Sequence, residues 1–156
     1  MVTVVVNVCQ PEGRGRLELC REDLGAPPKI YPELMHGTKT MDSMIKGIQL
    51  VREIFRSSIL NPYVKKEITP GVTVETREEL KQWIREATID TVHPCGTCKM
   101  GKDELSVVDD RLHVIGVSGV RVVDASIMPS ITTGNTNAPS IVIAEKAADL
   151  ILSDQY

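Results

Sequence analysis

The chain of 156 residues has few aromatic side chains and no long apolar run. Phe, Trp and Tyr together make up 3% of the residues, so any core is expected to consist mainly of Val, Ile, Leu and Met. No stretch approaches the roughly 20 apolar residues that cross a bilayer as a helix, which argues against a membrane span. The net charge of −3, with both signs interspersed, argues against a nucleic-acid partner.

The first residues, MVTVVVNVCQPEG, have neither the basic flank nor the small-residue cleavage site of a secretory signal. The four cysteines, at positions 9, 20, 95 and 98, are therefore expected to be reduced thiols, and a cytoplasmic location is the corresponding expectation. The composition is 42% hydrophobic and 25% charged, as in globular proteins. The length is sufficient for one domain with its own core.

Apolar periodicity predicts three helices. From Met41 to Ser57, apolar residues recur every three or four positions. A second helix is expected to begin after Thr76, because Thr76 and Glu79 have the spacing of a capping box. A third helix is expected over residues 140–152, just after Pro139, which suits a first helical turn.

β-Branched and alternating segments predict strands at Val2–Val8 and Gly15–Cys20, joined by a turn. Further short strands are predicted around residues 106–109, 112–116 and 120–126. A strand that begins almost at the first residue indicates a chain cut from a longer one, or a sheet that continues in another polypeptide. These elements predict an α+β fold, with a mixed or antiparallel sheet and helices on one of its faces.

Residues 91–101, TVHPCGTCKMG, admit three chemical interpretations. Cys95 and Cys98 have metal-ligand spacing, but a structural zinc site needs four ligands and no second such pair follows. A dithiol redox motif usually lies at a helix N-terminus, whereas Gly101 interrupts any helix here. In the third interpretation, the stretch is one wall of a catalytic pocket, although a lone histidine such as His93 usually has only a structural role.

A second informative stretch runs from Asp124 to Ile151. A strand ends at Asp124, and a loop with glycine and asparagine then leads into the last helix. The N-terminus of a helix presents free N–H groups and partial positive charge, which suits an anionic group. Asn135 and Asn137 flank this start. In the ordinary structural interpretation, Asn135 is a turn residue and Asn137 is the N-cap.

Together, HPCGTCKMG (residues 93–101), SVVDDRLHVIGVSGVRVVDASIMP (residues 106–129) and GNTNAPSIVIAEKAADLI (residues 134–151) resemble the C-terminal part of the glucose–methanol–choline (GMC) family of flavin-dependent oxidoreductases. The choline-dehydrogenase-like branch is the most similar. The resemblance implies that residues 1–105 form most of a substrate-binding part. It also implies that residues 106–156 are closing strands and a final helix that dock on an FAD-binding domain.

The resemblance also gives a role to His93. In the family, the histidine of this motif faces the flavin and the substrate hydroxyl, so His93 is expected to act as the base. It would take the proton of a small primary alcohol while hydride leaves the carbon for flavin N5. An imidazole suits such a step because its ordinary pKa lies near neutrality. Asn135 corresponds to the family's second active-site position, where an amide can orient the substrate oxygen.

The cofactor-binding residues implied by the resemblance lie in the last third of the chain. Asn137, Ala138 and Pro139 match the helix start that approaches the flavin pyrimidine ring, where positive potential would stabilise reduced flavin. Asp124 and Ala125 match positions near the ribityl–pyrophosphate part of FAD. No metal ligand is implied.

The chain lacks the Gly-x-Gly-x-x-Gly turn that accommodates the FAD pyrophosphate. The FAD site is therefore expected to be incomplete, and the partner to be an FAD-binding polypeptide or a missing N-terminal domain. Without such a partner, the apolar face of the last helix, with Ile141, Ile143 and Leu150, is expected to have less to pack against. The alternatives are a non-catalytic fragment of the family that binds a partner, and a small metal or thiol protein based on its cysteines.

Overall fold

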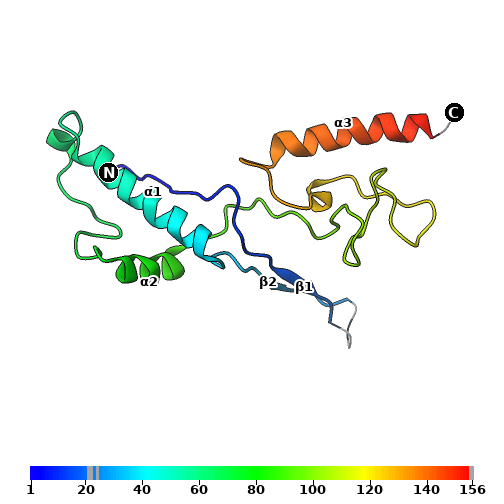
Figure 1. The fold of residues 1–156 in the computed structure, drawn as a ribbon, viewed down its shortest axis with the longest axis horizontal. Helices are drawn as coiled ribbons and strands as arrows, with labels where there is room; N and C mark the ends of the chain where they lie inside the picture. The colour runs from blue at the N-terminus through cyan, green and yellow to red at the C-terminus, as the bar shows by residue number, and fades with distance from the viewer. Residues whose placement is uncertain (21–22, 24, 155–156) are drawn as a thin grey trace. The chain divides into compact units, whose positions relative to one another are not determined.

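The computed structural model describes residues 1–20, 23 and 25–154 (Figure 1). Contacts divide the chain into two compact units, and each unit has a hydrophobic core of its own. The first unit comprises residues 1–15 and 30–90, and the second comprises residues 16–29 and 91–156. In chain order the elements are β1 (Arg16–Glu18), β2 (Lys29–Tyr31), α1 (Thr38–Arg56), η1 (Asn61–Tyr63), α2 (Arg77–Ala87), η2 (Ala125–Ile127) and α3 (Asn137–Ser153).

The core of the first unit lies between α1 and α2, which pack against each other (Figure 1). This confirms the two amphipathic helices predicted in this region. The predicted capping box of α2 is also confirmed, since Glu79 N–H donates to the Thr76 hydroxyl and Thr76 N–H donates to the Glu79 carboxylate. The buried side chains are Met41, Ile45 and Ile48 of α1 with Leu80 and Ile84 of α2.

The N-terminal segment runs beside α1 (Figure 1), but the strand predicted at Val2–Val8 is wrong. No residue from 2 to 8 belongs to a strand in the described part of the chain, because no second strand lies there to pair with it. Val6 packs on α1 at Gly47, where an added Cβ would come within 2.4 Å of a Val6 methyl carbon. Glu12 fastens the same segment, because its carboxylate accepts from the N–H groups of Lys39 and Thr40 at the start of α1.

The described residues contain one sheet, and it has only two strands, β1 and β2. Strand β1 confirms the centre of the strand predicted at Gly15–Cys20. The strands predicted over 106–109, 112–116 and 120–126 are reduced to isolated bridges, which join Val108 to Met100 and Val114, and His113 to Arg121. The fold therefore mixes helices with a small sheet, and the larger sheet covered by helices does not form because its strands lack neighbours.

The core of the second unit gathers around Val108, Leu112, Ile127 and Ala147, all of which are buried. Helix α3 contacts η2 here (Figure 1), and partly buried Ile143 and Leu150 pack against the same cluster. These two side chains therefore have neighbours within the unit, whereas Ile141 is 56% exposed, and the exposed side of α3 also carries Val142 and Leu152. No helix in the part of the chain that the structure describes combines the length and apolar character needed to cross a bilayer.

The capping box predicts a measurable contribution to stability. Replacing Thr76→Ala removes the acceptor for Glu79 N–H, and the free energy of unfolding is expected to fall by about 1 kcal/mol. Urea unfolding followed by circular dichroism measures the change. Thr73→Ala is the matched control, because Thr73 is an exposed loop residue just before α2. Equal effects of the two substitutions would show that the cap does not stabilise α2.

Candidate functional site

Backbone hydrogen bonds bring two of the sequence motifs side by side in the second unit. Cys98 N–H donates to the carbonyl of Ser126 at 3.0 Å, and Met100 N–H donates to the carbonyl of Ile127 at 2.8 Å. The motif that contains His93 is thus attached directly to η2, the short helix that follows Asp124. Residues about 30 positions apart in sequence are therefore held together by backbone hydrogen bonds.

A glycine shapes the turn just after His93. Gly96 has a φ of 88°, a conformation that L side chains rarely adopt. An added Cβ at this position would lie 3.2 Å from the carbonyl oxygen of Met128. The turn therefore requires glycine both for its backbone conformation and for its close approach to residues 126–128.

His93 is half-buried, and its ring is held by one side chain. Its Nδ1 lies 3.1 Å from the hydroxyl oxygen of Thr136, which is buried at the start of α3. Val92, the preceding residue, has a φ of 56°, which is an outlier for a β-branched side chain.

The start of α3 presents open backbone donors. Its N-cap is Thr136, which rules out the ordinary structural role considered for Asn137, and the Thr136 side chain makes no capping hydrogen bond. The N–H groups of Asn137 and Ala138 form no hydrogen bond with any other residue that the structure describes, and both residues are exposed. Because Pro139 has no N–H, these two donors and the helix dipole give this end its affinity for negative charge. Asn135, just before the cap, is also exposed.

Asp124 and Ala125 lie at η2, as its N-cap and its first residue. Ser126 lowers the pKa of Asp124, through its hydroxyl first and then through its backbone N–H, which donates to Oδ1 at 2.7 Å. Asp124 is therefore an anion at neutral pH. Its carboxylate can accept hydrogen bonds from hydroxyl groups, whereas it would repel a phosphate.

Cys95 and Cys98 form no disulfide within the described residues, and both are half-buried beside this turn. Within residues 1–20, 23 and 25–154, no three His, Cys, Asp or Glu side chains are grouped so that they could hold a metal ion. The Cys98 backbone has a structural role, through its bond to Ser126.

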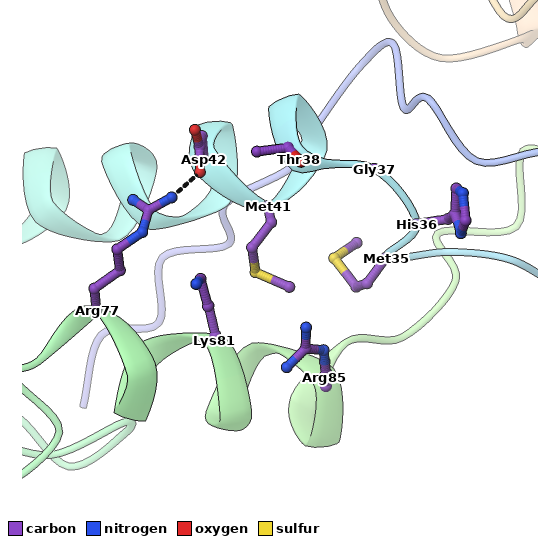
Figure 2. A pocket seen from close by; sticks show the side chains of 9 residues that line it. All are labelled: Met35, His36, Gly37, Thr38, Met41, Asp42, Arg77, Lys81 and Arg85. Carbon is purple, nitrogen blue, oxygen red and sulfur yellow. Dashed lines mark hydrogen bonds and ion pairs between the residues drawn. The ribbon is translucent and has the colours of Figure 1, made fainter.

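A separate hollow of about 480 Å³ lies in the first unit, between α1 and α2. Figure 2 shows basic side chains of α2 reaching toward it, with Arg77 bonded to Asp42 of α1. Lys81 is likewise paired, with Glu78 at 2.7 Å, so two of the three cations of α2 are already neutralised. None of the site residues predicted from the sequence lines this hollow, whose walls are Met35, His36, Gly37, Thr38, Met41, Asp42, Arg77, Lys81 and Arg85.

Sequence reasoning missed Thr136. It selected the asparagines on either side, which are exposed, and passed over Thr136, whose hydroxyl lies within hydrogen-bond distance of the His93 ring. The available signal was its position next to a predicted helix start, where threonine is a common N-cap. Its actual partner could not be inferred without the fold, because 43 positions separate the two residues.

Gly96→Ala is expected to destabilise the second unit more than Gly116→Ala. Both glycines have positive φ, at 88° and 81°, so both changes introduce a strain on the order of 1 kcal/mol. Only the Cβ at position 96 also meets a neighbour, the Met128 carbonyl, since nothing lies within 4 Å at position 116. Urea unfolding of the two variants measures the difference. A smaller effect at position 96 would contradict the close approach.

Most of the chain, including these site residues, matches known proteins. A family model described as GMC oxidoreductase matches residues 11–144. The oxygen-dependent choline dehydrogenase of Pseudomonas fluorescens (strain SBW25) is 47% identical over 142 residues, which cover 91% of this chain and 25% of that protein. The chain thus spans about a quarter of the length of the curated relatives it matches.

Two solved structures share the fold. Pyridoxine 4-oxidase from Mesorbium loti has a TM-score of 0.82 at 32% identity, over 90% of this chain and 28% of that one. An FAD-dependent oxidoreductase from Chaetomium thermophilum has a TM-score of 0.87 at 26% identity, over 94% of this chain and 26% of that one. The family model covers most of the chain, and the named relatives agree with it. The chain therefore belongs to the GMC oxidoreductase family and is similar to its choline dehydrogenases.

Proposed function

We propose that the chain is the substrate-side part of an FAD-dependent oxidoreductase that oxidises a small primary alcohol. The observation that carries this proposal is the bond between His93 Nδ1 and Thr136 Oγ1, because it holds an imidazole at the open N-terminus of α3. Membership of the GMC family supports it, as do relatives named choline dehydrogenase and pyridoxine 4-oxidase, since choline and pyridoxine both carry a primary hydroxyl group.

In this proposal His93 is the catalytic base. Its imidazole takes the hydroxyl proton of the alcohol, which raises the electron density on the oxygen and favours departure of hydride from the carbon. Asn135 is exposed beside the helix start, and its amide can donate a hydrogen bond that orients the substrate oxygen. The half-buried position of His93 leaves part of the ring accessible to a substrate.

The residues present fit part of an FAD molecule, which when bound supplies the acceptor for hydride. The N–H groups of Asn137 and Ala138, followed by Pro139, would lie toward the electronegative edge of the flavin pyrimidine ring. Asp124, as an anion, suits the ribityl hydroxyls and not the pyrophosphate, and Ala125 follows it as the first residue of η2. No glycine-rich turn for the pyrophosphate occurs in the sequence.

The remaining part of the FAD site is proposed to come from an FAD-binding polypeptide or an N-terminal domain. The matched relatives are about four times as long as the segment they share with this chain, which leaves room for such a part. Residues 1–105 would contribute to substrate binding and residues 106–156 would dock on the FAD-binding part. The exposed Ile141, Val142 and Leu152 of α3 support docking, because apolar side chains gathered on one surface favour burial.

A hybrid enzyme tests the proposal. This chain replaces the matching quarter of the Pseudomonas fluorescens choline dehydrogenase, so that the relative supplies whatever binds the rest of FAD. The visible spectrum of the purified hybrid reports bound flavin, and bleaching of that spectrum by a panel of primary alcohols without oxygen reports hydride transfer. We expect bound flavin and bleaching. His93→Gln is expected to lower the rate of bleaching by at least about 100-fold.

His36→Gln is the matched control, because His36 is exposed in the first unit and is expected to leave the rate unchanged. A hybrid that binds no flavin would contradict the proposed cofactor site. A hybrid that binds flavin but is bleached by no alcohol would favour a non-catalytic fragment of the family. Equal rates for His93→Gln and the unmodified hybrid would remove His93 from the role of base.

A further inference from the structure

We infer that Thr136 is a positioning residue that fixes the tautomer of His93. The Thr136 hydroxyl oxygen accepts a hydrogen bond from His93 Nδ1–H, so that the lone pair of the ring lies on Nε2. Nε2 is then the atom that takes the substrate proton. That this proton comes from the substrate rests on the proposed function. The tautomer of His93 is a property of this chain and can be measured whether or not the proposed function holds.

The geometry of Thr136 supports a fixed partner for the ring. The side chain is buried, and its hydroxyl oxygen lies 3.1 Å from His93 Nδ1. The backbone of Thr136 is held as well, since its carbonyl accepts from both the N–H and the hydroxyl of Ser140, at 3.0 and 2.7 Å. The hydroxyl therefore projects from the N-cap of a 17-residue helix, where the backbone is held by the first helical hydrogen bond.

The hydroxyl is used differently from that of an ordinary N-cap threonine. At an N-cap, a threonine oxygen usually accepts from the second or third N–H of the helix. Thr76 does so at the start of α2, but Thr136 forms no such bond and is paired with the ring of His93 instead. One residue type at the same helical position thus has two uses in this chain, a cap on α2 and a contact to histidine on α3.

The direction of the bond follows from what a base must do. If the hydroxyl donated to Nδ1, the neutral ring would carry its hydrogen on Nε2 and could not accept a proton there. If Nδ1–H donates to the hydroxyl oxygen, Nε2 is free to accept, and the same bond persists after the ring becomes imidazolium. Nε2 forms no hydrogen bond with any residue of the described ranges, which agrees with a site left for substrate.

Nitrogen-15 NMR of the histidine rings tests the tautomer in this chain alone, without flavin. The chain has three histidines, and His36→Gln and His113→Gln assign the signals by subtraction. We expect the ring of His93 to be protonated at Nδ1 when neutral. Thr136→Val keeps the shape of the side chain and is expected to shift the ring toward the Nε2–H tautomer, whereas Thr136→Ser is expected to keep the original tautomer.

A ring of His93 that is protonated at Nε2 in the unmodified chain would overturn the inference. So would a Thr136→Val spectrum identical to that of the unmodified chain. A loss of amide dispersion in Thr136→Val would indicate unfolding. The decision would then rest on Thr136→Ser, which must show the Nδ1–H tautomer for the inference to stand.

The hybrid enzyme supplies a kinetic readout that a merely structural role would not give. Thr136→Val is expected to lower kcat about 10- to 100-fold with little change in KM, because the residue acts on the base and does not touch the substrate. Thr136→Ser should recover most of kcat. Unchanged kcat in Thr136→Val would overturn the positioning role. A hybrid without flavin would instead count against the proposed function and leave the NMR result intact.

Discussion

The second unit depends on backbone hydrogen bonds between residues 98–100 and residues 126–127. The described residues of this unit form no extended ladder of strands, so its irregular segments must satisfy their polar groups through individual pairs of this kind. The two bonds fix the turn at Gly96 against η2, and the core around Val108 and Ile127 forms on the same framework. His93 and the start of α3 come together because both are attached to it.

Helices and their caps were predictable from the sequence because the signals are local. The apolar stripes of α1 and α2 and the Thr76 capping box are defined by residues three or four positions apart, and the structure confirms them. The strand predicted at Val2–Val8 was wrong for a complementary reason. A strand needs a neighbour, and β-branched residues without one form an extended segment whose Val6 side chain rests on a helix.

The candidate site, too, was predictable only where its signals are local in the sequence. The motif around His93 and the asparagines near the last helix could be recognised in the sequence, because each is a short pattern. The contact between His93 and Thr136 could not, since it depends on how the turn at Gly96 and the first turn of α3 are placed in space. The helix is capped by Thr136 and not by Asn137, and Thr136 is the residue whose side chain contacts His93.

Helix α3 has apolar side chains on opposite sides, and only one side is covered within its own unit. A charged residue at Val142 would cost this chain little, because solvent already surrounds that position. In an assembly that covers α3, the same residue would bury a charge without a partner. Tolerance to substitution, if scored on this chain alone, would therefore rank Ile141, Val142 and Leu152 as free to vary, and that ranking would reverse in any assembly that covers this side of α3.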